Sequence, residues 1–218
     1  MDGPPAVALG VEKRHGNVMA RPPRPVDEGL PNSRDIGLIF YLGAVMVIGT
    51  LIVFFLAGGG VYGYGNECTI APFATEADAG FSVADCLAGD QQAVDAYNVY
   101  AEDTFANAQT MTFTVFIVFQ LFNVLNCRSE KESLFSLGLF SNGAINYAIL
   151  ASGFLLFVFV HFATFSLPLI GIEFGNLLST TPLEGIDWLV LIAVASTVFL
   201  VEEFRKLMIK SRFFSVRR

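Results

Sequence analysis

Four long apolar runs divide the chain, and each has about the length of a helix that crosses a bilayer. They cover Ile36–Ala57, Ala108–Leu125, Ala144–Ser166 and Ile186–Val201. A helix rises about 1.5 Å per residue, so about 20 apolar residues cross about 30 Å of hydrocarbon. The pattern therefore predicts an all-α membrane protein whose core is a four-helix transmembrane bundle.

The basic residues follow the same division. All 13 Lys and Arg residues lie before the first run, between the second and third, or after the fourth, whereas the other two gaps contain only acidic charged residues. Basic residues mark the cytoplasmic side of membrane proteins. We therefore expect a multi-pass protein of the cell membrane with both termini in the cytoplasm and two acidic loops outside.

Composition supports a membrane location and argues against nucleic acid as a partner. Hydrophobic residues make up 54% of the chain and charged residues 15%, which leaves too little polar surface for a water-soluble domain. The net charge of −7 is sorted by compartment and does not form one basic face. The lipid bilayer is the first partner that the sequence predicts.

The apolar runs also define the domain organisation. Residues 1–35 are rich in proline and read as an irregular cytoplasmic segment. Residues 36–207 form the transmembrane domain, including an acidic outside loop at 58–104 in which Ala88–Asn98 favours a short helix, and residues 208–218 form a basic cytoplasmic tail. The short connection between the second and third runs predicts an antiparallel hairpin.

The fourth span has a recognisable start in the sequence. Thr181 can act as the helix cap, Pro182 suits the first helical position, and Glu184 completes the pattern of a capping box. We therefore predict that the helix begins directly after Thr181.

Two of the three cysteines lie in the long acidic loop. An oxidising compartment permits a disulfide between Cys68 and Cys86, whereas Cys127 lies at the inner end of the second span. The spacing alone leaves two free thiols open as the alternative.

Polar residues gather on one face of the second span. At about 100° per residue, Thr112, Gln120, Asn123 and Asn126 lie within about 120° of one another. Their amide and hydroxyl oxygens suit hard cations such as calcium, magnesium or manganese, although binding is weak without a carboxylate from another helix. Hydrogen bonding between helices is the alternative reading of the same face.

For the other ionisable residues in or near the spans, the sequence predicts roles in packing and ion pairing rather than in binding. His161 stands alone in the third span without a Cys, Asp or second His one turn away, so we interpret it as a packing residue. Glu202 and Glu203 are followed by Arg205 and Lys206, which predicts ion pairs at the interface.

The sequence contains no self-contained catalytic apparatus. It has no Gly-rich phosphate loop, no nucleophile with a base, and no Cys or His metal quartet. We expect no resident cofactor and no independent metal site, and participation in an enzyme only as one part of it.

Several short motifs resemble one family of membrane pumps. The opening Met1–Ala6 (MDGPPA), Ala8–Gly10 and Arg21–Arg24 (RPPR) resemble the end of the sixth transmembrane helix and the next loop of calcium-transporting P-type ATPases. The region from Thr110 through Gln120 and Asn123 to Glu130 is similar to the eighth helix of these pumps, and Ser133–Asn142 resembles the secretory-pathway branch. Glu202, Glu203 and Lys206 are similar to the end of the tenth helix, and the resemblance covers about residues 2–32 and 108–207.

The resemblance implies a fold and a set of ion ligands. The four spans would correspond to helices seven to ten of a P-type ATPase. Asp2, Gln120 and Asn123 would be the cation-binding residues, with Gln120 in place of the glutamate of the sarcoplasmic-reticulum branch. Calcium would be the transported ion, with manganese as a second candidate.

The resemblance also implies what this chain does not do alone. The phosphorylated-aspartate motif and the nucleotide-binding domain are absent from these residues, so ATP and magnesium would act only through other domains of the parent pump. The missing helices and cytoplasmic domains would be the protein partners. Because the match begins in mid-motif at Met1, we expect that Met1 is an internal residue of a longer protein.

Two functional hypotheses follow. In the first, the chain is the carboxy-terminal membrane module of a P-type cation pump, supporting and partly lining the ion path without hydrolysing ATP itself. In the second, it is a stand-alone four-helix binding or regulatory subunit whose acidic outer loop collects cations weakly. In either case the polar face of the second span favours a partner, because lipid cannot satisfy its hydrogen bonds.

Overall fold

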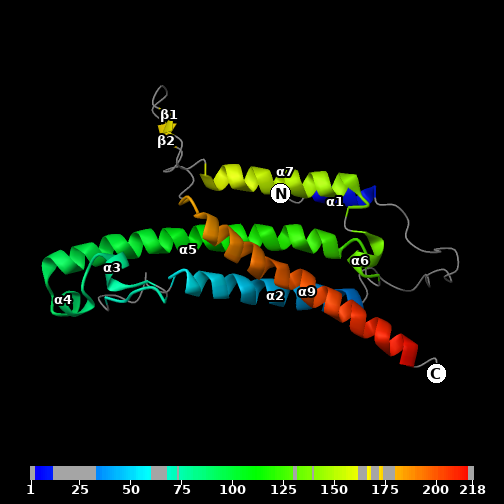
Figure 1. The fold of residues 1–218 in the computed structure, drawn as a ribbon, viewed down its shortest axis with the longest axis horizontal. Coiled ribbons are helices and arrows are strands. Elements are labelled where there is room, and N and C mark those ends of the chain that lie inside the picture. The colour runs from blue at the N-terminus through cyan, green and yellow to red at the C-terminus, as the bar shows by residue number, and fades with distance from the viewer. Residues whose placement is uncertain are drawn as a thin grey trace. The chain divides into compact units, whose positions relative to one another are not determined.

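The computed structural model describes residues 3–11, 33–59, 68–72, 74–129, 132–138, 140–161, 166–167, 172–173 and 180–215, without side chains at 33–34, 166–167, 172–173 and 210–215. Four long helices dominate this part of the chain (Figure 1). They are α2 (Ser33–Leu56), α5 (Gln91–Asn126), α7 (Gly143–His161) and α9 (Gly185–Ser215). The shorter elements are α1 (Gly3–Gly10), α3 (Glu76–Ala79), α4 (Val83–Leu87), α6 (Leu134–Leu137) and the antiparallel two-residue strands β1 (Ser166–Leu167) and β2 (Ile172–Glu173).

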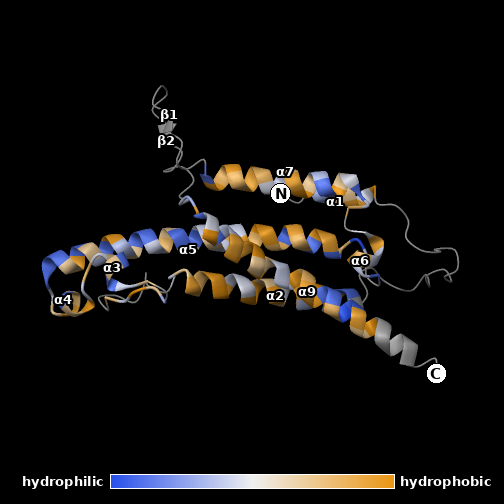
Figure 2. Cartoon of the chain, viewed as in Figure 1, coloured by the Kyte–Doolittle hydropathy of each residue, from blue (hydrophilic) through white to orange (hydrophobic). Residues whose placement is uncertain are grey.

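Each long helix contains a segment that is long and apolar enough to cross a membrane. These segments are Asp35–Leu56, Gln91–Asn126, Gly143–His161 and Gly185–Ile209. Their apolar character is visible along the ribbons in Figure 2. The predicted all-α membrane fold with four spanning helices is confirmed.

The second spanning helix is longer than predicted. The sequence suggested a loop to residue 104 with a short helix at Ala88–Asn98, whereas α5 runs unbroken from Gln91 for 36 residues. Its polar first part is blue in Figure 2. This part remains helical because Asp90 accepts a hydrogen bond from the backbone N–H of Ala93, and because Tyr97 and its neighbours pack against a small core.

Two further boundaries differ from the prediction. The third span ends at His161, and Ser166 instead pairs with Glu173 in the short sheet. At the other end of the chain, Gly3–Gly10 form a helix where an irregular segment was predicted. Pro4 and Pro5 fit there because the first turn of a helix uses no backbone donor.

The fourth spanning helix begins later than its sequence signals indicated. It starts at Gly185, where the carboxylate of Asp187 accepts from the backbone N–H of Glu184 at 2.9 Å. Thr181 does not cap the helix. Its backbone N–H donates to the hydroxyl of Thr110 on α5 at 3.0 Å, and its own hydroxyl lies 3.3 Å from the same atom. The predicted capping box is therefore wrong, because Thr181 is used for a contact with α5.

Replacing Thr110 with valine should destabilise the protein by about 1–3 kcal/mol, because the N–H of Thr181 would lose its acceptor. The matched control is Thr112→Val on the same helix. Thr110 and Thr112 both donate to the carbonyl four residues earlier, but among the described hydrogen bonds only Thr110 also contacts Thr181. Thermal unfolding of the purified chain in mild detergent should show a drop for T110V that exceeds that for T112V. Equal losses would contradict a role for this contact.

The chain divides into two compact units. Unit 1 comprises Met1–Val47, Ile117–Leu155 and Ala195–Arg218, and unit 2 comprises Ile48–Phe116 and Leu156–Val194. In unit 1, Ala8 of α1 packs with Ile145 and Ala148 of α7, and Val124 and Leu125 of α5 lie against them.

The packing of α5 against α7 confirms the predicted antiparallel hairpin. In unit 1, Val124 and Leu125 pack near Ile145. Further along, the side chain of Leu121 lies 3.8 Å from the position that a Cβ would take if Gly153 had one. Residues earlier in α5 therefore contact residues later in α7, as antiparallel helices require. Arg128, which is 6% exposed, fixes the connection by donating to the carbonyl of Gly138 at 3.1 Å and to the hydroxyl of Ser141 at 2.7 Å.

Unit 2 contains a small core around a disulfide. Cys68 and Cys86 are bonded, which confirms the predicted bridge over the alternative of two free thiols. Phe81 packs edge-on against Tyr97 of α5, and the hydroxyl of Tyr100 accepts from the backbone N–H of Ala71 at 3.1 Å. We call residues 68–90 the stapled segment, because the disulfide and these contacts hold it against α5.

Candidate functional site

The two predicted ligands on α5 both have amide groups that are poorly satisfied. Gln120 is half-buried, and its Nε2 donates to the Sδ of Met46 on α2 at 3.9 Å. A thioether sulfur is a weak acceptor. The Oδ1 of Asn123 is buried and accepts no hydrogen bond from the part of the chain that the structure describes. Such a group costs free energy unless something else supplies a donor or a cation.

The other two residues of the polar face are used within the fold. Thr112 donates to the carbonyl of Ala108 in its own helix at 2.6 Å. Asn126 donates from Nδ2 to the carbonyl of Val198 on α9 at 3.3 Å. Interhelical hydrogen bonding therefore explains the amide nitrogen of Asn126. The amide oxygens of both Asn123 and Asn126 are buried and accept no hydrogen bond from the described residues.

The third predicted ligand, Asp2, lies outside the described residues. Within the residues that are described, no three His, Cys, Asp or Glu side chains come together in a way that could hold a metal ion. Gln120 and Asn123 would thus need carboxylates from elsewhere to bind a divalent cation firmly.

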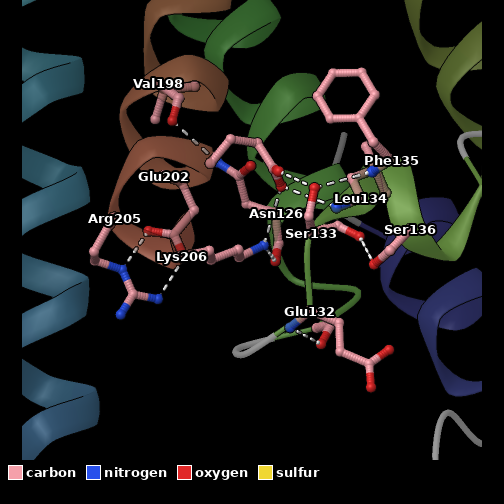
Figure 3. A network of polar contacts seen from close by, with 12 residues as sticks. Asn126, Glu132, Ser133, Leu134, Phe135, Ser136, Val198, Glu202, Arg205 and Lys206 are labelled. Atoms are coloured by element: carbon pink, nitrogen blue, oxygen red, sulfur yellow. Dashed lines mark hydrogen bonds and ion pairs between the residues drawn. The ribbon is translucent and has the colours of Figure 1, made fainter. Parts of the chain in front are cut away.

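A cluster of polar residues lies where the end of α5 and the start of α6 contact the second half of α9 (Figure 3). Glu203 of α9 accepts from the hydroxyl of Ser133 at 2.5 Å and from the backbone N–H of Leu134 at 3.0 Å. Lys206 lies 3.6 Å from Glu203 and donates to the carbonyl of Asn126 at 3.4 Å. We call Asn126, Ser133, Glu203 and Lys206 the polar cluster.

The polar cluster is buried to an unusual degree for charged groups. Glu203 is 5% exposed and Lys206 3% exposed. The neighbouring Glu202 is 2% exposed and receives two hydrogen bonds from the guanidinium of Arg205, at 2.7 and 2.6 Å. The predicted ion pairs are present, but their burial makes them part of the protein interior. The hydrogen bonds of Glu203 and Lys206 to residues outside α9 tie this helix to the end of α5 and to the connection after it.

Sequence reasoning missed the partners of this cluster. Ser133 and Glu203 are 70 residues apart, and nothing in a Ser-Leu-Phe string marks its hydroxyl as a partner for a buried carboxylate. One feature of the sequence could have indicated that Glu203 is buried. Glu202 and Glu203 directly follow an apolar run, and acidic residues that lie inside protein must be neutralised by partners.

His161 takes part in ring stacking at the end of α7, as its packing interpretation predicts. Its ring stacks on Phe157 with centroids 4.2 Å apart and on Trp188 of α9 at 6.1 Å. Its Nδ1 lies 3.1 Å from the carbonyl of Phe157.

Comparison with known families agrees with a membrane fold of four spanning helices. A family model described as "Cation transporting ATPase, C-terminus" matches residues 1–208. The chain belongs to this family. The resemblance to calcium-transporting P-type ATPases is thereby confirmed, and the four spanning helices are the carboxy-terminal membrane bundle of such an ATPase.

The curated relatives of this chain are much longer proteins. Calcium-transporting ATPase 1 of Saccharomyces cerevisiae is 29% identical over 209 residues, covering 95% of this chain and 17% of the relative. Calcium-transporting ATPase 1 of Schizosaccharomyces pombe is 32% identical over 208 residues, covering 94% and 17%. Calcium-transporting ATPase type 2C member 2 of Rattus norvegicus is 30% identical over 207 residues, covering 95% and 17%. The chain thus spans about a sixth of the length of these relatives.

Proposed function

We propose that this chain is the carboxy-terminal membrane module of a P-type calcium pump, in which α5 lines part of the ion path. The observation that carries this proposal is the pair of Gln120 and Asn123 on a cation-ATPase helix, with amide groups that the described contacts leave poorly satisfied. In this role both termini face the cytoplasm, as the distribution of basic residues favours. ATP hydrolysis belongs to the other domains of the pump.

The chemistry of these two residues favours a hard divalent cation. Carboxamide oxygens coordinate calcium and manganese, and the buried Oδ1 of Asn123 is available without breaking a described hydrogen bond. Gln120 would give up only a weak contact with the sulfur of Met46. Neither residue carries charge, so carboxylates from elsewhere in the pump, with Asp2 as one candidate, would supply most of the attraction.

The remaining helices serve as support for that path. The polar cluster and the contacts of Arg128 hold α9 and the connection after α5 in fixed positions within unit 1. Only 17% of the most apolar stretch of α2 is buried within the described residues, which leaves surface for lipid and for the other helices of the pump.

A chimera tests this proposal directly. The chain would replace the matching carboxy-terminal part of Calcium-transporting ATPase 1 of Saccharomyces cerevisiae in cells that lack their own copy. We expect ATP-dependent uptake of radioactive calcium into isolated vesicles, with manganese competing for it. A well-expressed chimera that phosphorylates but never transports would contradict the proposal and would favour a separate binding or regulatory subunit.

Within the chimera, Gln120→Leu and Asn123→Leu should each lower the apparent affinity for calcium by roughly tenfold, equivalent to about 1.4 kcal/mol, because each removes one oxygen ligand. The matched control is Gln109→Leu, which removes the same amide from an exposed position of α5. Calcium dependence of vesicle uptake measures the change. If Q109L lowers the affinity as much as Q120L, the loss reflects general damage to the helix.

A further inference from the structure

A cavity of about 710 Å³ opens beside the stapled segment. It lies between that segment, the first part of α5 and Ala57, which directly follows α2. Figure 1 shows α3 next to this part of α5. All residues that line the cavity belong to unit 2, so its shape is set within one compact unit.

The walls of the cavity are fixed by the contacts of the stapled segment. Tyr100 of α5 lines the cavity, and its hydroxyl accepts from the backbone N–H of Ala71 at 3.1 Å. The ring of Tyr100 also packs edge-on against Phe81, with centroids 5.8 Å apart. The disulfide holds the same segment. The cavity is therefore preformed, as most binding sites are.

The cavity presents apolar surface beyond the hydrocarbon of the membrane. About 20 residues of α5 that end at Asn126 cross the apolar core, so the helix before about residue 107 lies outside it. Five alanines and one glycine line the cavity, together with Val99, which is 62% exposed. Exposed apolar surface that lipid tails cannot cover and that polar groups surround is typical of a binding site for another molecule.

Two carboxylates give the cavity a negative charge. They belong to Asp78 of α3 and Asp103 of α5, which are both exposed. Thr75 donates to Asp78 from its hydroxyl at 2.7 Å and from its N–H at 2.9 Å, and these hydrogen bonds hold the pKa of Asp78 below its usual range. The sequence has no Lys or Arg between Arg34 and Arg128, so neither the stapled segment nor α5 supplies a basic partner.

The kind of cation that fits follows from the mixture of charge and apolar wall. Among the described residues, no three acidic, His or Cys side chains come together to hold a metal ion, so the cavity is not built for a divalent cation. Lys and Arg side chains carry a charged head on an apolar stem, and they lay the stem along apolar surface. Alanine walls beside two carboxylates match both parts of such a side chain.

We propose that this cavity receives a lysine- or arginine-rich segment of a partner protein. The stems lie against the alanine walls, and the charged heads lie at Asp78 and Asp103. Because alanine and glycine are small, the backbone of the segment can approach closely. The interaction depends on the stapled segment and not on ion transport.

Fluorescence anisotropy of a labelled peptide tests this proposal, with the full chain purified in an uncharged maltoside detergent. The probe is a helical peptide of alanine and lysine, and its neutral counterpart has glutamine in place of every lysine. We expect the lysine peptide to bind the chain and the glutamine peptide not to bind. Raising the salt concentration to about 0.5 M should weaken binding several-fold, because both carboxylates are exposed to solvent.

One pair of substitutions tests the role of charge. Asp78→Asn combined with Asp103→Asn should weaken binding on the order of tenfold. Asparagine at position 78 keeps an oxygen that can accept from Thr75, so the local fold is retained. The matched control is Asp85→Asn combined with Asp95→Asn. It removes the same charge from exposed positions that do not line the cavity, and it should bind like the unchanged chain.

A second substitution tests the shape of the cavity without changing its charge. Ala96→Leu should weaken binding to a similar degree, because leucine would fill the cavity from the side of α5. Asn98→Leu is the control, since it places leucine at an exposed position of the same helix outside the cavity. Thermal unfolding of each variant should match that of the unchanged chain, so that lost binding reports on the cavity alone.

Three results would overturn the proposal. Equal weakening by the two pairs of aspartate substitutions would mean that the peptide is attracted diffusely to an acidic surface. Unchanged binding by A96L would mean that the peptide does not enter the cavity. Binding in detergent that disappears in phosphatidylcholine nanodiscs would mean that lipid headgroups fill the cavity instead of a protein segment.

Discussion

Replacing Glu203 with glutamine should cost about 3–5 kcal/mol of stability, the largest effect that we expect from any single substitution in this chain. The reason is Lys206, which is 3% exposed and lies 3.6 Å from the carboxylate of Glu203. In the variant the ammonium group would stay buried with only the carbonyl of Asn126 as a described partner. The carboxylate also accepts from Ser133 and Leu134, and a neutral amide offers a single oxygen for both.

Thermal unfolding in mild detergent measures this loss, and a double variant tests its cause. If an unpaired buried charge is responsible, Glu203→Gln combined with Lys206→Met should recover a large part of the stability that E203Q loses alone. Glu102→Gln is the matched control, because Glu102 is exposed on α5 and should tolerate the same change. A small effect of E203Q, or a double variant as unstable as the sum of both single variants, would contradict the role of the pair.

The positions of the spanning helices could be predicted because the length of an apolar run is a local property. The run at Ile36–Ala57 predicts α2 to within three residues at each end. The start of α5 could not be found in this way, because residues 91–107 mix polar and apolar side chains and their helix depends on packing against the stapled segment. Thr181 failed for a similar reason, since its partner Thr110 is 71 residues away in the sequence.

In the candidate site, too, features set by the local sequence could be predicted, and features set by contacts with other helices could not. Helical periodicity was enough to place Gln120, Asn123 and Asn126 on one face of α5. It could not distinguish them, because their different roles depend on other helices. The amide nitrogen of Asn126 donates to Val198 on α9, and that of Gln120 donates to Met46 on α2. The buried amide oxygens of Asn123 and Asn126 have no described hydrogen-bond donor.

Removing the disulfide should release the stapled segment while leaving the spanning helices intact. The bridge closes a loop between residues that are 18 positions apart, which is worth about 3 kcal/mol. The segment depends on this bridge because its core contains only seven buried residues, and two of these are the cysteines themselves. Cys68→Ser should therefore make backbone amides of residues 75–87 exchange with solvent about a hundredfold faster. Amides of α7 should not change.

Comparing single and double variants separates the covalent bond from the packing of sulfur atoms. If the bond itself stabilises the segment, Cys68→Ser, Cys86→Ser and the double variant should give equal losses, because the first substitution already breaks the bridge. Buried thiols that only filled space would give losses that add in the double variant. Cys127→Ser is the control, since Cys127 is a free cysteine outside the bridge and its loss should leave the exchange of residues 75–87 unchanged. Additive losses would mean that the stapled segment is held by its contacts with Tyr97 and Tyr100 of α5, and that the disulfide contributes little to its stability.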